Sequence, residues 1–299
     1  MTTFSKWLKR LSALMVGGAA MTLSGCKQMV ILDPEGIIAA DEKRILIIAV
    51  LLMLLVVLPV IFLAVTISHK YRASNKKANY TPDWGHSTIL EIVWWAIPCV
   101  IIAILAAITL TSSHSLDPYR PLDEKGKPLV IQVVALNWKW LFIYPEQNIA
   151  VVNFVQFPVN QPIRFLITSD APMNSFQIPS LAGQIYAMAG MQTKLNLLAT
   201  KTGDYRGYSA NYSGNGFAGM NFTARVSSQK EFDEWVKSVK AKSSNPSLTL
   251  ERYNDIMKDS ENNPVEYFSS VSPNLFNIVL MKFMMPMGSV QDQKNLENR

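Results

Sequence analysis

Cysteine and histidine are scarce in this sequence of 299 residues, which contains two cysteines and three histidines. None of the five lies beyond residue 114; they are Cys26, Cys99, His69, His86 and His114. Zinc sites, copper sites and Ser-His-Asp triads depend on these two residue types. Residues 115–299 therefore cannot hold an internal disulfide, a Cys or His zinc site, a Ser-His-Asp triad, or a blue or dinuclear copper site.

Charged residues are also few. They make up 17% of the chain against 49% hydrophobic residues, a composition that indicates membrane content. The residues behind the net charge of +6 are scattered along the sequence. They form no stripe of Lys and Arg interleaved with aromatic residues. We therefore expect no nucleic-acid partner and assign the excess charge to solvated surface and membrane-flanking residues.

The first 25 residues have the pattern of a secretory signal. Lys6, Lys9 and Arg10 form a basic start, and the apolar stretch 11–23 is too short to span a bilayer. Residues 23–26, Leu-Ser-Gly-Cys, match the lipobox of bacterial lipoproteins, which implies cleavage before Cys26 and attachment of diacylglycerol to its sulfur. The alternative is a free cysteine after an ordinary signal peptide. Residues 26–44 are then expected to form a short periplasmic segment.

Two long apolar runs follow, at 45–67 and 89–110, with 23 and 22 residues. Each is long enough for a transmembrane helix, which takes about 20 residues. The loop 68–88 between them carries four basic residues and one acidic residue, so the positive-inside rule places it in the cytoplasm. With Cys26 outside, two crossings put the rest of the chain in the periplasm, as expected for a multi-pass protein of the bacterial inner membrane.

Glu91 lies near the cytoplasmic end of the second predicted span. An ionisable residue is costly in lipid, so it usually faces protein or water and often serves ion movement. The alternative interpretation is a carboxylate that extends to the interface and has no role. The sequence around Glu91 leaves both interpretations open.

After a polar linker at 111–128, the pattern changes to short β-strands separated by Pro, Gly, Asn and Asp. We predict strands at 129–135, 139–144, 150–154, 163–169, 194–199, 204–209 and 221–227. Spacing of this kind is typical of a sandwich or barrel, so 129–227 is predicted to be one β domain. Residues 228–299 are predicted to be a helical extension and tail, with helices at 229–242 and 248–258. The apolar stretch 265–285 is interrupted and should be a packing or docking tail, not a third span.

The stretch 207–220, GYSANYSGNGFAGM, has the length of a metal-binding loop between two strands. Its glycines allow tight turns, and Met220 stands where a thioether could complete a soft-metal site. The thiolate and imidazole ligands of a copper centre are missing, because the loop offers hydroxyl groups and a phenyl ring in their place.

This loop, the upstream stretch APMNSFQIP, and the motifs YPEQ and QIYAMAGMQT resemble subunit II of the haem-copper respiratory oxidases. Members with a dinuclear copper site (CuA) carry Cys, Glu, Cys, His and Met in this loop and a further His upstream. Those positions fall here on Ser209, Asn211, Ser213, Phe217, Met220 and Asn174. Of these six positions, only Met220 still carries the residue type that binds copper in those members. The loss is similar to that in the quinol-oxidase branch, subunit II of the bacterial cytochrome o (bo-type) ubiquinol oxidases.

The resemblance implies a membrane-anchored α + β chain, with a two-helix transmembrane hairpin followed by a periplasmic cupredoxin-like Greek-key β-barrel and C-terminal helices. It implies an aerobic respiratory complex that oxidises ubiquinol, reduces dioxygen to water and translocates protons. This chain would be a non-redox subunit, not catalytic by itself and without a cofactor or metal of its own. Haems and copper would lie in subunit I. Partners would be subunits I, III and IV and the lipid bilayer, and Glu91 would lie at the mouth of a proton-uptake channel of subunit I.

Two other interpretations remain open at this point. One is a CuA-type cytochrome c oxidase subunit, against which the replaced ligand positions argue. The other is a membrane-anchored lipoprotein whose sandwich binds a small ligand, for which two long spans and Glu91 would be superfluous. Metal content and the presence of haem-bearing partners separate these possibilities.

Overall fold

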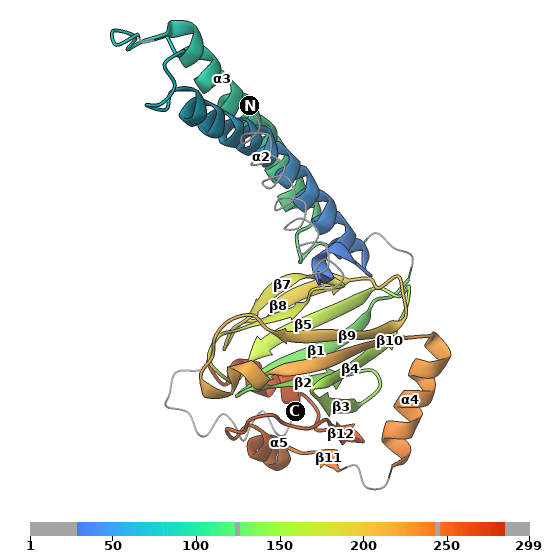
Figure 1. The fold of residues 1–299 in the computed structure, drawn as a ribbon. Coiled ribbons are helices and arrows are strands. Elements are labelled where there is room, and N and C mark those ends of the chain that lie inside the picture. The colour runs from blue at the N-terminus through green and yellow to red at the C-terminus, as the bar shows by residue number, and fades with distance from the viewer. Residues whose placement is uncertain (1–28, 80, 123–125, 243–245, 285–299) are drawn as a thin grey trace, which may run out of the picture.

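The computed structural model describes residues 29–79, 81–122, 126–242 and 246–284. Within them, a helical hairpin projects from one end of a β domain (Figure 1). The predicted signal segment 1–25, Cys26 and the end of the polar tail lie outside the described residues.

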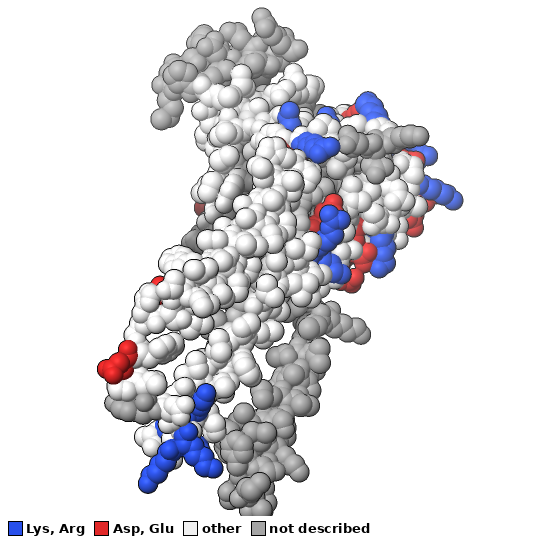
Figure 2. Space-filling model, turned by 90° about the horizontal axis from the view of Figure 1, so that it is seen from above, with Lys and Arg blue, Asp and Glu red and all other residues white. Residues whose placement is uncertain are grey.

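The hairpin consists of α2 (Ile37–Lys70) and α3 (Thr88–Ser115), after a short 3-10 helix η2 (Val30–Leu32). Among the described residues these two helices are long and apolar enough to cross a membrane. Figure 2 shows the hairpin as a shaft almost free of charged residues, with charges gathered at its free end and over the β domain. Both helices extend beyond the predicted spans 45–67 and 89–110, because the charged residues 41–44 and the polar residues 111–115 are also helical.

Two sheets form the β domain. The six-stranded sheet has the order β12-β3-β2-β1-β5-β8, and the five-stranded sheet has the order β4-β10-β9-β6-β7. β1 pairs with β5 and β4 pairs with β10 in parallel, whereas the remaining pairs in these sheets are antiparallel. The bounds are β1 Leu129–Leu136, β2 Lys139–Tyr144, β3 Ile149–Val152, β4 Phe154–Pro158, β5 Ile163–Ser169, β6 Asn174–Ile178, β7 Ala182–Ala187, β8 Thr193–Leu197, β9 Gly203–Ser209, β10 Asn221–Ser227 and β12 Glu266–Phe268.

Aromatic side chains fill the space between the sheets. Trp140 and Phe142 on β2 face Phe176 on β6 and Phe222 on β10, and all four are buried. Phe176 and Phe222 stack with ring centroids 5.1 Å apart, and Trp140 meets Phe176 edge to face at 5.3 Å. Such pairs add to the stability that apolar burial provides.

The six-stranded sheet is buried on both faces. Its outer face packs against α5 (Leu250–Ile256) and α6 (Leu275–Met281), with Leu141 and Val152 in contact with a cluster that includes Tyr253 and Phe276. This explains why residues 140–144, after Lys139, form a continuous apolar run instead of an alternating pattern. α4 (Gln229–Ala241) covers another flank, with Phe232, Val236 and Val239 buried.

The C-terminal region differs from the predicted helical extension. The predicted helices at 229–242 and 248–258 correspond to α4 and α5, and residues 265–284, predicted as part of an interrupted apolar tail, contain two short strands and a short helix. It contributes β12 to the edge of the six-stranded sheet, beside β3, and β13 (Ser270–Val271), which pairs with β11 (Ser247–Leu248). α6 follows them.

Candidate functional site

The loop between β9 and β10 and the start of β6 form the first candidate site. β6 and β9 are paired, which brings Asn174 next to Ser209 although the two are 35 residues apart. The Ser209 hydroxyl donates a hydrogen bond of 3.0 Å to Asn174 Oδ1, and the Asn174 amide donates to the Pro172 carbonyl at 2.7 Å. Asn211 Nδ2 donates to the Met173 carbonyl at 2.8 Å.

The remaining positions of the loop lie close by. The Ser209 N–H donates to the Met220 carbonyl at 3.2 Å, and the Met220 N–H donates to the Phe217 carbonyl at 3.0 Å. The Met220 side chain is buried. Phe217 is half-buried and contacts the exposed ring of Tyr212, with centroids 5.5 Å apart. The structure thus brings the predicted loop positions to one end of the five-stranded sheet.

Trp138 lies against this loop. Its backbone is left-handed, with φ at 61°, and its indole Nε1 donates to the Ser213 carbonyl at 3.1 Å. Gly216 makes the contact possible, because a Cβ atom there would come within 2.4 Å of the indole ring. Within the described part of the chain the Ser213 hydroxyl is buried without a hydrogen-bond partner. Trp138 therefore holds the loop through packing and one hydrogen bond.

The chemistry of these side chains does not fit a dinuclear copper centre. Such a centre takes thiolate and imidazole ligands, whereas Asn174, Ser209 and Asn211 offer amide and hydroxyl groups already engaged in hydrogen bonds. Met220 is the one soft donor of the mapped set. Among the described residues no group of three or more His, Cys, Asp or Glu side chains is arranged to hold a metal ion.

Glu91 lies in the first turn of α3, at the end of the hairpin away from the β domain. Its Oε2 atom is 3.2 Å from Nε2 of His86, and both side chains are more than half exposed. Trp84, Trp94 and Trp95 line a pocket of about 330 Å³ around this pair. The contact between His86 and Glu91 was not predicted from the sequence. His86 directly precedes Ser87, the N-cap of α3, and this position in the sequence could have indicated the contact. The chain turns into the helix there and brings the side chains of His86 and Glu91 together.

A buried carboxylate, Asp170, was also missed. It follows β5 directly, and its side chain is 1% exposed. The Tyr253 hydroxyl on α5 donates to Asp170 Oδ2 at 2.7 Å, and Lys282, at the end of α6, lies 2.8 Å from Oδ1. Burial and the charge of Asp170 raise the pKa of Tyr253. The contacts join the C-terminal helices to the end of β5, so the arrangement is structural.

Comparisons with known proteins agree with this architecture. Three family models match the chain: "Cytochrome C oxidase subunit II, transmembrane domain" over residues 35–111, "Cytochrome C oxidase subunit II, periplasmic domain" over 141–226, and "COX Aromatic Rich Motif" over 242–287. The periplasmic domain of subunit II of cytochrome oxidase from Bradyrhizobium japonicum is a similar solved structure. It is 26% identical with a TM-score of 0.37, over 38% of this chain and 94% of that chain.

Several curated relatives are similar over nearly the whole chain. Cytochrome bo(3) ubiquinol oxidase subunit 2 of Pseudomonas aeruginosa is 53% identical over 93% of this chain and 81% of that protein. Ubiquinol oxidase subunit 2 of Acetobacter aceti is 48% identical over 93% and 90%. Quinol oxidase subunit 2 of Bacillus cereus is 37% identical over 83% and 86%. The predicted family and fold class are confirmed, and the chain belongs to the ubiquinol oxidase subunit 2 branch of the cytochrome oxidase subunit II family.

Proposed function

We propose that this chain is the copper-free subunit II of a ubiquinol oxidase complex that reduces dioxygen to water and translocates protons. The observation that carries the proposal is the loop at Asn174, Ser209 and Asn211, whose amide and hydroxyl groups are bonded to one another and to the backbone. Without thiolate and imidazole ligands this loop cannot accept electrons from a soluble donor through copper. A reductant from the membrane, such as the ubiquinol named for the relatives, supplies electrons to another subunit.

In this proposal the chain supports subunit I, which carries the haems and the copper of the oxygen site. The β domain covers the periplasmic face of subunit I, and the hairpin packs beside it in the bacterial inner membrane together with subunits III and IV. The orientation is supported by the basic residues at the free end of the hairpin, which place that end in the cytoplasm.

Purification of the native complex tests this function. The proposal expects the chain to co-purify with a haem-bearing partner and with ubiquinol oxidase activity, and metal analysis to assign no copper to the β domain. A CuA-type cytochrome c oxidase subunit would bring two copper ions per β domain. A lipoprotein binding module would purify without haem-bearing partners, and either result would contradict the proposal.

Glu91 is the residue of this chain that we assign to proton entry. Its carboxylate lies 3.2 Å from His86 in an aromatic pocket at the cytoplasmic end of the hairpin, where water and protons can reach it. Glu91→Gln keeps the shape of the side chain and removes its ionisable proton. We expect turnover and proton uptake to fall severalfold while the haem content of the complex stays unchanged.

Glu146→Gln is the matched control, because Glu146 is an exposed carboxylate of the β domain paired with Lys127 at 2.6 Å. Its variant should keep the turnover of the unmodified complex. Full turnover in an assembled Glu91→Gln complex would leave Glu91 as an interfacial residue without a role in proton entry.

A further inference from the structure

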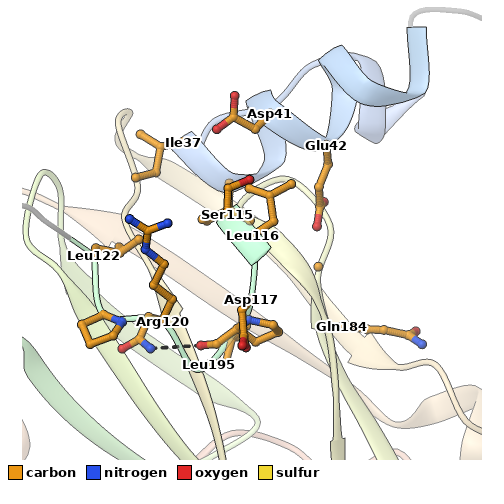
Figure 3. A pocket seen from close by; sticks show the side chains of 15 residues that line it. Ile37, Asp41, Glu42, Ser115, Leu116, Asp117, Arg120, Leu122, Gln184 and Leu195 are labelled. Atoms are coloured by element: carbon orange, nitrogen blue, oxygen red, sulfur yellow. Dashed lines mark hydrogen bonds between the residues drawn. The ribbon is translucent and has the colours of Figure 1, made fainter. Parts of the chain in front are cut away.

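Both legs of the hairpin meet the β domain at one strand, β8. This strand ends the order of the six-stranded sheet, where β5 is its one partner. Figure 3 looks into the junction, where the first turns of α2 and the end of α3 meet β7 and β8 around a pocket of about 400 Å³. The attachment of the legs therefore depends on the contacts around this open space.

The α2 leg is bound through its backbone to the residues that follow β8. The Glu35 carbonyl accepts hydrogen bonds of 2.9 Å from both the N–H and the hydroxyl of Thr200. The Ile37 N–H donates to the Leu198 carbonyl at 3.3 Å. The start of α2 is thus joined to the edge of the sheet much as a further strand would be, and it cannot turn without breaking these bonds.

Gly36, between these two contacts, is not a hinge. Its backbone is extended, with φ at −131° and ψ at 157°, a conformation that any residue adopts. A Cβ atom there would come within 2.5 Å of the Leu181 carbonyl oxygen, so glycine allows the close approach of two backbone segments. Ala39 is buried, and Ile38 packs against the core between the sheets. Packing therefore fixes this leg in addition to the hydrogen bonds.

The α3 leg is bound three residues after its helix ends. The Pro118 carbonyl accepts two hydrogen bonds from Asn196 in β8, one from the backbone N–H at 3.2 Å and one from the side-chain amide at 3.0 Å. Asn196 is itself held in place, because its Oδ1 accepts from Nε of Arg164 on β5 at 3.2 Å and only 6% of the residue is exposed. The predicted polar linker 111–128 is therefore not a free tether at this point.

The two attachments have the spacing of two packed helices. Asn196 binds the α3 leg and Ala199 pairs with Gly36 of the α2 leg, three residues further along the chain. Three extended residues span about 10 Å, and packed helices lie about 8 to 10 Å apart. Two attachments leave rotation only about the line that joins them, and the packing of Ile38 and Ala39 opposes that rotation.

We propose that residues 35–39, 118 and 196–200 form a rigid joint that holds the β domain at one orientation to α2 and α3. The hairpin and the β domain then move as one body, in contrast to domains joined by a simple linker. The inference goes beyond the proposed function, because it concerns this chain by itself. In the complex the joint sets where the β domain lies relative to the membrane and to subunit I.

Energy transfer between two dyes tests the joint on the full chain, purified without partner subunits and placed in nanodiscs. The dyes are attached to ketone-bearing amino acids introduced at Lys76, in the loop between the helices, and at Lys237, on α4. Both positions are exposed, and this chemistry leaves the native cysteines unlabelled. Single-molecule measurements give the distribution of distances, and we expect one narrow distribution for the unmodified chain.

Gly36→Ala combined with Asn196→Ala should open the joint. The first substitution forces the α2 leg away from Leu181, and the second removes both side-chain hydrogen bonds of Asn196. We expect the distance distribution to broaden. We also expect the amide hydrogens of the joint to exchange about fivefold faster or more, as the loss of a hydrogen bond produces.

Two control variants should behave as the unmodified chain. Lys201→Gln removes an ion pair with Glu35 in which the lysine is 67% exposed, and such pairs contribute little. Asn221→Ala removes an exposed side-chain contact with Arg206, away from the joint. Broadening in either control to the extent seen in the double variant would contradict the assignment of the joint to the named contacts.

Two results would overturn the proposal. One is a broad distribution in the unmodified chain, and the other is an unchanged, narrow distribution in a folded double variant. Slow amide exchange in β2 shows that the β domain is folded. If the double variant is unfolded, Asn196→Ala alone takes its place and should broaden the distribution to a smaller extent; no broadening would then overturn the joint. Because ubiquinol, haem and subunit I take no part in these measurements, a failure of the joint is distinct from a failure of the proposed function.

Discussion

At the scale of single residues, the positions that would hold copper are already neighbours. Ser209 and Asn174 are hydrogen-bonded to each other, and the Ser209 N–H is bonded to the Met220 carbonyl. We therefore predict that restoring the ligands restores copper binding. The variant combines Asn174→His, Ser209→Cys, Asn211→Glu, Ser213→Cys and Phe217→His. It supplies two thiolates, two imidazoles, a carbonyl and the Met220 thioether, a set suited to copper.

Metal analysis and a thiolate-to-copper absorption band measure the result. The fourfold variant that keeps Ser213 is the control and should bind copper weakly, since such a site needs its ligands together. A folded fivefold variant without copper would show that the mapping of these positions is wrong. Tyr212 should not obstruct the change, because this residue is 73% exposed.

Gly216 carries the second prediction at this scale. A Cβ atom there would lie 2.4 Å from Trp138 Cδ2, in a part-buried indole that also donates to the Ser213 carbonyl. Gly216→Ala should lower the free energy of unfolding by about 1 to 3 kcal/mol, as overpacking does. Gly85→Ala is the control, because nothing lies within 4 Å of a Cβ atom at that position. Thermal unfolding of the purified chain measures both, and equal stability of the two variants would exclude the packing role of Trp138.

At the scale of elements, α4 begins with a capping box. The Ser228 N–H and hydroxyl both donate to Glu231 Oε2 at 2.8 Å, and the Glu231 N–H donates to Ser228 Oγ at 3.3 Å. Ser228→Ala should lower the free energy of unfolding by about 1 kcal/mol at neutral pH. Ser238→Ala, later in the same helix, is the control and should change it less.

The effect of the cap should depend on pH. The hydrogen bonds from Ser228 hold the pKa of Glu231 below its ordinary value. The folded state therefore favours the ionised carboxylate, and this contribution is complete above the ordinary pKa of glutamate. It is lost as the pH falls through the lowered pKa of the folded state. Denaturant unfolding at neutral and at strongly acidic pH should show the difference between Ser228→Ala and the unmodified chain narrowing in acid.

The helices and strands with a regular pattern of apolar residues were predicted correctly from the sequence. β2, β5 and β10 have the predicted bounds, and α4 differs from its prediction by one residue. The predicted strand 150–154 is instead divided at Asn153, whose φ of 57° turns the chain from β3 in one sheet to β4 in the other. β6 and β7 were missed, because polar residues and Gly183 interrupt their apolar pattern.

For the candidate site, the sequence predicted which chemical groups are present or absent, because residue types alone determine this. The absence of thiolate and imidazole from 207–220 is visible in the sequence, and so is the carboxylate of Glu91. The residues that contact one another across the fold cannot be identified from the sequence. Trp138 reaches Ser213 across 75 positions, and Asp170 meets Tyr253 across 83, so the pairing of distant strands and helices determines both contacts.

At the scale of the whole molecule, α2 and α3 are long and apolar enough to anchor the chain in a membrane without a contribution from Cys26. We predict that Cys26→Ser leaves the protein in the membrane fraction, because a spanning helix holds a protein far more firmly than acyl chains do. Fractionation of cells that express the variant measures this, with a chain lacking residues 45–110 as the control. Recovery of the Cys26→Ser protein in the soluble periplasmic fraction would show that α2 and α3 do not span.

The pairing of β12 with β3 has a consequence for synthesis and export. β3 at Ile149–Val152 is an outer strand of the six-stranded sheet until Glu266–Phe268 arrives more than a hundred residues later. In the proposed periplasmic location of the β domain, residues 266–268 must cross the membrane before this edge is covered. In the interval β3 presents unpaired backbone groups, which promote pairing between nascent chains. Residues 266–268 thus lower this risk of aggregation only after most of the β domain has emerged, and a stop codon just before residue 266 would yield chains prone to cluster.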